Sequence, residues 1–487
     1  MLQYEKPKYW LRGQKMRLLF ILSVILLPDF LPAQEPVSFL NDRFSGISAA
    51  PFSPTHPFIN ENTFDINIIS EDIFAQNRHI YISRQSILGI IGADIETANS
   101  KKGISGEKSP NILDYFNKEK ETFHFSSDVM GPAFSVSPKI GKNKYVFGIF
   151  TRLRTQGSGI GLDNYLRFDN SGVNPPQIYE LQPFKTNVMN WGELAFHISK
   201  NLDLDDTNQL IFGANMKYEI GMDAVVINNK KQSVLRRIPQ EDESYHTEIS
   251  DYDIDAFYAT AYDFDKEKYT AKKQGSGFGL DFGIAFLHKN PDSEKYDFKV
   301  SLNILDFGYI NFQGAQHHLN GANFDFDDFD SDDIENPTDF FHTISQEIYG
   351  NPNQSLTGNS LKIGLPTSIH FNAGKRIKEN GFLNFDWVQR ISFFENSLKR
   401  SNISTLSYSV QKQVFGAGIS ASVYEYEDLR FGGYIRIGPL VLGSENAFPL
   451  LFKHKHLHGA DFYIAIKLSP FWDNELKRRQ RSKCGCD

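Results

Sequence analysis

The sequence predicts an all-β protein, a single large antiparallel transmembrane β-barrel of about 14 strands (about 12–16) behind an irregular N-terminal segment. Three observations predict this fold. The chain starts with an export signal, its later segments alternate large apolar side chains with small or polar ones, and no helical pattern follows these segments to cover a parallel sheet. Many segments also have the length of tilted membrane strands, ~9–11 residues.

Residues 1–33 are predicted to be an N-terminal extension and signal peptide. Lys15 and Arg17 precede the apolar run 18–27, and a cleavage site is expected after Ala33. The apolar run is too short to cross a bilayer comfortably as a helix. We therefore expect the protein to leave the cytoplasm.

Composition narrows the function classes. The 487-residue chain is 40% hydrophobic, 14% aromatic and carries a net charge of -8. Aromatic enrichment is typical of β-structure and of membrane barrels, whereas the negative charge argues against a nucleic-acid partner. The two cysteines, Cys484 and Cys486, lie in a basic tail, 473–487, that is predicted to be periplasmic, so no disulfide framework is expected in the barrel.

The stretch 275–290, "GSGFGLDFGIAFLHKN", shows the alternation most clearly. Phe278, Leu280 and Phe282 alternate with Gly279 and Asp281, so one face of the strand is bulky and the other small or polar. We expect the bulky face to meet lipid and the other face to line a lumen.

Similar alternation extends over the predicted outer-membrane β-barrel, residues 61–472. Residues 34–60 are rich in Pro, Ser and Asn and are predicted to form an irregular segment that can fold into the lumen.

Several segments, in their order along the chain, resemble the uncharacterised outer-membrane β-barrel proteins of Bacteroidota bacteria. The segments that carry the resemblance are "FINENTFDINIIS", "MGPAFSVSPKIGKNKYVFGIFTRLRT", "WGELAFHISKNL", "LIFGANMKYEIGMDA", "GSGFGLDFGIAF", "SLNILDFGYINF", "GLPTSIHFNAG", "IRIGPLVLGSENA" and "GADFYIAIKLSPF". The resemblance extends through most of the mature sequence and implies a barrel in the cell outer membrane. It carries over no catalytic or ligand-binding residue.

An acidic cluster is the first candidate metal site. Its carboxylates are close enough in sequence to bind Ca²⁺, although the spacing does not fit an EF-hand loop. We favour an acidic external loop, either solvated or bridged to lipopolysaccharide by divalent cations, within a polar stretch from about Gln313 to Ser360. The candidate ligands are Asp325, Asp327, Asp328, Asp330, Asp332 and Asp333.

Three histidines form the second candidate metal site. His454, His456 and His458 alternate, so they share one face of an extended segment at a spacing of ~6.6 Å. Two of them can reach a transition metal if the backbone bends, but a solvated turn before the last strand is the favoured interpretation.

The sequence contains no nucleophile–base motif, P-loop or zinc-protease motif, so we predict that the protein is not an enzyme. Calcium is the one cofactor that the residues suggest. The expected function is a channel for small, hydrophobic molecules. The alternative is a non-transporting structural or assembly barrel that partners a secretion or surface-attachment machine. Expected partners are outer-membrane lipid, lipopolysaccharide and a periplasmic or outer-membrane protein.

Overall fold

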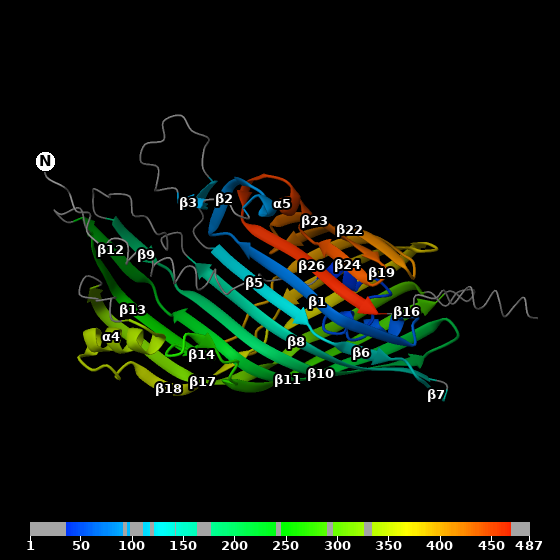
Figure 1. The fold of residues 1–487 in the computed structure, drawn as a ribbon, viewed down its shortest axis with the longest axis horizontal. Helices are drawn as coiled ribbons and strands as arrows, with labels where there is room; N and C mark the ends of the chain where they lie inside the picture. The colour runs from blue at the N-terminus through cyan, green and yellow to red at the C-terminus, as the bar shows by residue number, and fades with distance from the viewer. Residues whose placement is uncertain are drawn as a thin grey trace, which may run out of the picture. The chain divides into compact units, whose positions relative to one another are not determined.

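The computed structural model describes residues 36–468 except 91–94, 98–110, 117–120, 142, 163–176, 240–244, 290–295 and 326–333. Within these ranges, twenty strand segments form one sheet. The sheet closes because β1 (Phe64–Asn77) pairs antiparallel with β26 (Gly459–Leu468), from Ile66 opposite Leu468 to Gln76 opposite Gly459 (Figure 1). The segments make a closed antiparallel barrel of 14 wall strands, which confirms the predicted fold.

The number of segments exceeds the number of wall strands because some wall strands are interrupted. β5 and β6, for example, are separated at Gly131 and Pro132, and proline has no N–H to donate to a ladder. The remaining segments of this sheet are β5 (Glu121–Met130), β6 (Ala133–Val136), β7 (Lys139–Ile140), β8 (Asn143–Leu162), β9 (Gln177–Leu181), β10 (Phe184–Asp203), β11 (Asn208–Asn229), β12 (Ser233–Pro239), β13 (Tyr245–Ala259), β16 (Gly275–Lys289), β17 (Tyr296–Asp325), β18 (Leu356–Gly364), β19 (Ser368–Lys378), β20 (Gly381–Arg390), β21 (Ile403–Gln411), β22 (Phe415–Tyr424), β23 (Asp428–Ile437) and β24 (Leu440–Ser444).

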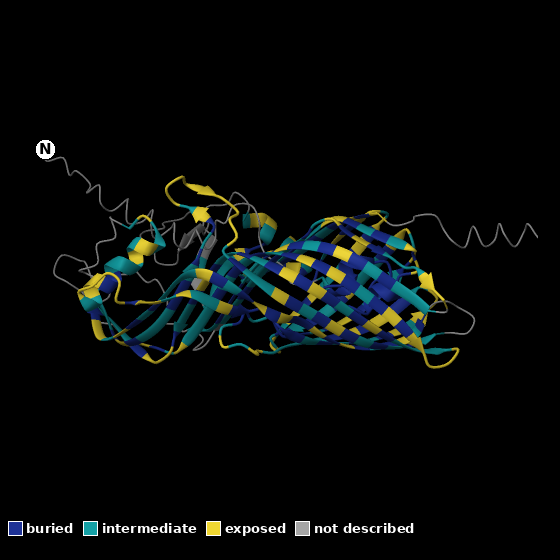
Figure 2. Ribbon diagram, turned by 90° about the horizontal axis from the view of Figure 1, so that it is seen from below, coloured by how far each residue is buried: buried dark blue, intermediate teal, exposed yellow. Residues whose placement is uncertain are grey.

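Burial alternates along the wall strands with the period that the sequence predicts. In β11, Asn215, Lys217 and Glu219 are buried toward the lumen, whereas the exposed fractions of Met216 and Tyr218 are 51% and 47%. Figure 2 shows the same alternation as a pattern of buried and exposed residues over the barrel. Neighbouring strands are in register, so residues of one kind share one face of the wall.

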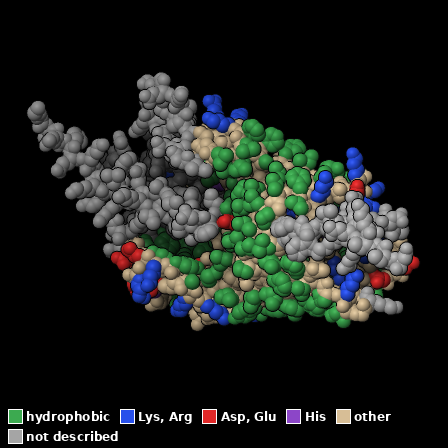
Figure 3. Space-filling view, turned by 45° about the vertical axis from the view of Figure 1, so that its right-hand side comes forward, with side chains coloured by type: hydrophobic (Ala, Val, Ile, Leu, Met, Phe, Trp, Pro, Cys, Tyr) green, Lys and Arg blue, Asp and Glu red, His purple; other side chains and the backbone are tan. Residues whose placement is uncertain are grey.

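The outer face of the wall is apolar. In Figure 3, hydrophobic side chains gather across the middle of the barrel, and Lys, Arg, Asp and Glu lie toward its ends. Phe282 is 52% exposed on this face, while Asp281 is buried on the other, as predicted. An apolar band of this kind would be unfavourable in water and matches the lipid-facing band of a membrane barrel.

The lumen is filled by the N-terminal segment, and we call residues 36–60 the plug. It contains α2 (Val37–Leu40) and two 3-10 turns, η1 (Gly46–Ala49) and η2 (His56–Ile59). Nearly every plug residue is buried, both apolar ones such as Ile47 and polar ones such as Asp42. A short polar segment can be buried so completely because wall side chains satisfy its backbone groups.

The remaining elements lie beyond the wall ladder. A four-stranded sheet is formed by β2 (Ile80–Gln85), β3 (Ile95–Thr97), β4 (Asn111–Tyr115) and β25 (His454–Leu457), and β14 (Tyr262–Asp263) pairs with β15 (Lys268–Tyr269). The other helices are α3 (Ile87–Ile90), α4 (Pro337–Tyr349) and α5 (Ala447–Leu451). Among the described residues, no helix is long and apolar enough to cross a bilayer.

One boundary differs from the sequence prediction. The polar stretch expected from about Gln313 begins later, because β17 continues to Asp325 and pairs there with β13. Polar residues in this part of β17 are paired in a ladder with β13, so their polarity does not mark a loop. Helix α4 follows, capped by the Asn336 side chain, which accepts from the N–H groups of Thr338 and Asp339.

Candidate functional site

A buried charge cluster lies on the lumen face of the wall, with Asp306 at its centre. Asp306 has a φ of 52° at a point where the register of β16 and β17 shifts, which is the geometry of a β-bulge. Its carboxylate accepts from Arg154 at 3.0 and 3.1 Å and from Lys217 at 2.5 Å, and it also contacts Arg400. One carboxylate therefore joins cations from three separate parts of the chain.

Further carboxylates balance these cations. Lys217 Nζ lies 2.8 Å from Asp281, and Arg152 pairs with Asp128 and, at 3.4 Å, with Glu193. Removing one partner of a buried ion pair costs about 3–5 kcal/mol because the other charge is left uncompensated. The cluster thus fixes one arrangement of β5, β8, β10, β11, β16 and β17 around the lumen.

Arg400 belongs to a connection that folds into the barrel. We call residues 391–402, between β20 and β21, the inner loop. Asn187 donates to the Ser397 carbonyl at 2.6 Å, and the Lys399 N–H donates to Ser158 at 3.1 Å. Leu398 is buried in the apolar cluster that contains Trp191. These contacts hold the inner loop against the lumen face.

Polar contacts hold the plug to several strands of the wall. Asp42 accepts from the Tyr434 hydroxyl at 2.8 Å and from Arg436 at 3.1 Å. Lys467 donates to the Ser45 carbonyl at 2.7 Å and to the Ser48 hydroxyl at 2.8 Å. The plug is thus attached by side-chain hydrogen bonds, ion pairs and apolar packing against the wall, rather than by a β-ladder.

The wall also leaves space for the plug backbone. A Cβ added to Gly213 in β11 would overlap the carbonyl group of Pro54. Gly283 lies opposite Gly213 in the ladder, and a Cβ there would be 3.2 Å from the Thr55 methyl. Small residues at this point of the lumen face let the plug pass close to the strands.

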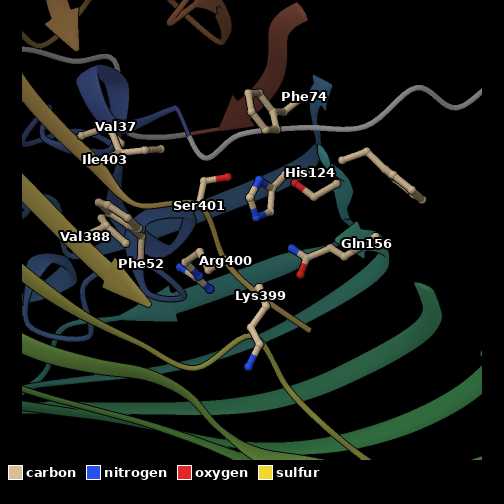
Figure 4. Close-up of a pocket in the computed structure, with 13 residues that line it drawn as sticks. Val37, Phe52, Phe74, His124, Gln156, Val388, Lys399, Arg400, Ser401 and Ile403 are labelled. Carbon is tan, nitrogen blue, oxygen red and sulfur yellow. The ribbon is translucent and has the colours of Figure 1, made fainter. Parts of the chain in front are cut away.

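A pocket lies between the plug, the inner loop and the wall (Figure 4). The space enclosed by its lining is about 520 Å³ when open solvent is included. Its polar lining includes His124, Gln156, Lys399, Arg400 and Ser401. The apolar lining is formed by Val37, Phe52, Phe74, Phe125, Val388 and Ile403.

The sequence comparison that decides the family covers most of the barrel. A model of a family of unknown function, DUF5723, matches residues 60–445. The chain belongs to the DUF5723 family. A comparison with curated protein sequences finds no match.

Three of the solved structures that are similar to this DUF5723 chain are a transporter, a translocator domain and a channel. The Ralstonia pickettii toluene transporter TbuX has 9% identity and a TM-score of 0.37 over 86% of this chain and 93% of its own. The translocator domain of the Neisseria meningitidis autotransporter NalP has 9% identity and a TM-score of 0.29 over 84% of this chain and 88% of its own. The monoaromatic hydrocarbon channel CymD has 7% identity and a TM-score of 0.29 over 87% and 92%.

The predicted calcium site falls mostly outside the described residues. In this DUF5723 chain, Asp325 is the last residue of β17 and lies 3.5 Å from His246. The other five candidates, Asp327, Asp328, Asp330, Asp332 and Asp333, lie outside the described residues. Calcium binding by the acidic cluster therefore stays a prediction.

The three candidate histidines lie in or next to β25, a strand of the four-stranded sheet. His454 and His456 are in β25, paired with Gln85 and Ser83 of β2, and the His456 ring packs on Tyr81. His458 Nδ1 lies 2.9 Å from the carbonyl oxygen of His456. In the part of the chain that the structure describes, no group of three or more His, Cys, Asp or Glu side chains is arranged to hold a metal ion.

The sequence analysis did not single out the charge cluster or the pocket. The sequence nevertheless carried a signal for the cluster. Lys217, Asp281 and Asp306 each have large apolar residues on both sides, and Arg154 follows Leu153, in strands whose alternate positions face lipid. A charge at the lumen-facing position of a membrane strand needs a partner, and four such charges predict a cluster.

Proposed function

We propose that this protein is an outer-membrane channel for small apolar molecules, closed in this structure by its own plug. The observation that carries the proposal is the way the plug fills the lumen. Residues 36–60 are buried inside a polar-lined barrel, where side-chain bonds, such as Asp42 with Arg436, and apolar packing hold them to many of its strands without a β-ladder. A segment attached in this way can move without breaking the wall.

The outer-membrane location is part of the proposal. The predicted export signal and a barrel with an apolar outer band support it, because closed barrels are the β-structures that lipid tolerates. The membership in Bacteroidota, the contacts with lipopolysaccharide, a protein partner and the absence of enzymatic activity are further expectations of ours. The pocket beside the plug supports a transport role over a purely structural one.

Displacing the plug tests the channel proposal. Gly213→Val places a side chain where Pro54 now lies, so we expect the plug to shift and the conductance of purified protein in planar bilayers to rise above that of the wild type. The control is Gly192→Val in β10, because a Cβ at Gly192 meets no atom within 4 Å. We expect the control to conduct like the wild type.

A heat-dependent gel shift, measured on all three proteins, establishes that each barrel is folded. If folded Gly213→Val protein conducts no better than the wild type, the plug is not a gate for this lumen. If no protein conducts at all, the structural or assembly alternative replaces the channel.

A further inference from the structure

The pocket beside the plug is lined by hydrogen-bond donors at one end and by apolar side chains elsewhere. His124 is 4% exposed, and its Nε2 has no hydrogen-bond partner among the described residues. Figure 4 shows the His124 ring between Ser401 and Gln156, within the pocket lining. A buried imidazole nitrogen without a partner is costly unless a ligand or water meets it.

The hydroxyl groups of Ser401 and Tyr424 determine which ring nitrogen of His124 carries the proton. The Ser401 hydroxyl donates to the Tyr424 oxygen at 3.3 Å, and the Tyr424 oxygen lies 2.8 Å from His124 Nδ1. We assign Tyr424 as the donor to Nδ1 because its oxygen already accepts from Ser401, and the proton of the neutral imidazole is then on Nε2. His124 therefore presents an N–H donor to the pocket.

The charge around the pocket is positive. Lys399 and Arg400 belong to its lining, and among the described lining residues none is Asp or Glu. Burial lowers the pKa of Lys399, and the nearby cations Lys185 and Arg390 lower it further. Arg400 is balanced by Asp306, whereas the Lys399 ammonium contacts only the Ser392 hydroxyl among the hydrogen bonds found for it.

We propose that this pocket binds an apolar molecule that carries one carboxylate, with the carboxylate at His124, Gln156 and the two cations and the apolar body against Phe52 and Phe74. The inference deepens the proposed function, on which it rests, by naming the class of substrate. A carboxylate accepts from N–H donors and favours positive surroundings, whereas a cation would meet the like charges of Lys399 and Arg400.

Binding to purified protein in lipid nanodiscs tests the site without any measurement of flux. The probes are 2-naphthoate, its neutral isostere 2-naphthamide and the cation 2-naphthylmethylammonium, each titrated calorimetrically and corrected with empty nanodiscs. We expect 2-naphthoate to bind about tenfold more tightly than the amide, and the cation not to bind, since a charged hydrogen bond is stronger than a neutral one.

Variants identify the residues responsible. His124→Phe and Lys399→Met should each reduce the preference for 2-naphthoate over 2-naphthamide, and Lys272→Met, an exposed lysine outside the pocket, should leave it unchanged. Equal affinity for the acid and the amide, or a preference that survives in both His124→Phe and Lys399→Met, would overturn the proposal. Binding without conductance in any variant would keep the site and remove only the channel.

Discussion

At the scale of single residues, the face of the wall decides what a side chain contributes. Phe282 projects into the apolar band, while its neighbour Asp281 accepts a hydrogen bond from Asn215 inside the lumen at 2.8 Å. The two residues are adjacent in the strand but lie in different environments, one on the outer face and one in the lumen, because successive strand side chains point to opposite faces.

Phe282→Arg tests this assignment. A cationic side chain on the lipid face near the middle of the bilayer costs about 2–4 kcal/mol, so we expect the variant to unfold at lower denaturant concentration than the wild type. The matched control, Phe282→Leu, keeps an apolar side chain and should lose much less stability. An unfolding midpoint for Phe282→Arg equal to that of Phe282→Leu would place this residue away from lipid.

The faces were predictable from the sequence, whereas the contacts within the charge cluster were not. Alternation in the strand 275–289 fixes which residues share a face, since the period is two. It does not reveal the bulge at Asp306, which reverses part of the pattern in β17, nor which cations reach across the lumen to its carboxylate. Those contacts depend on strand neighbours and on an inner loop that is distant in sequence.

At the scale of elements, the plug is the part whose structure was hardest to predict from the sequence. Its richness in Pro, Ser and Asn predicted irregular backbone but not its bonding partners. His56 illustrates why, because its ring nitrogens lie 3.0 Å from the Asp42 carbonyl and 3.4 Å from Lys299 Nζ in β17. Lys299 lies more than 200 residues from His56 in the sequence, so no local pattern connects them.

The attachment of the plug should weaken in acid. Burial, and then the charges of Lys299 and His370, lower the pKa of His56 from 6.5 to about 3. A folded-state pKa below the unfolded value means that this contribution to docking is complete above about pH 6.5 and is lost as the pH falls toward 3. We therefore expect the open fraction in planar bilayers to rise between about pH 7.5 and 4.5.

His56→Gln is the control, because it retains an amide donor for the Asp42 carbonyl and does not titrate. Its open fraction should change less with pH than that of the wild type. An identical acid response in both proteins would assign the effect to carboxylates elsewhere in the lumen.

At the scale of the whole molecule, the proposed channel requires a closed wall and a plug that can leave the lumen. The wall is continuous, since β1 pairs with β26 on one side and with β5 and β6 on the other. Passage through the lumen then requires the plug to move, because its residues are buried against the lumen face. Strand count and closure followed from the alternating segments, whereas the filling of the lumen by the plug could be seen only in three dimensions.

A reversible tether between plug and wall tests this claim most directly. The Ser48 hydroxyl of the plug lies 3.3 Å from the Asn67 side chain of β1, so Ser48→Cys and Asn67→Cys can be joined by a disulfide or a short reducible bridge, with Cys484→Ser and Cys486→Ser removing the other thiols. Single-channel conductance is recorded in one bilayer before and after reduction, with each single-cysteine variant as the control. We predict no openings while the tether is intact and wild-type openings after reduction; openings that are the same in both states would contradict a channel gated by its plug.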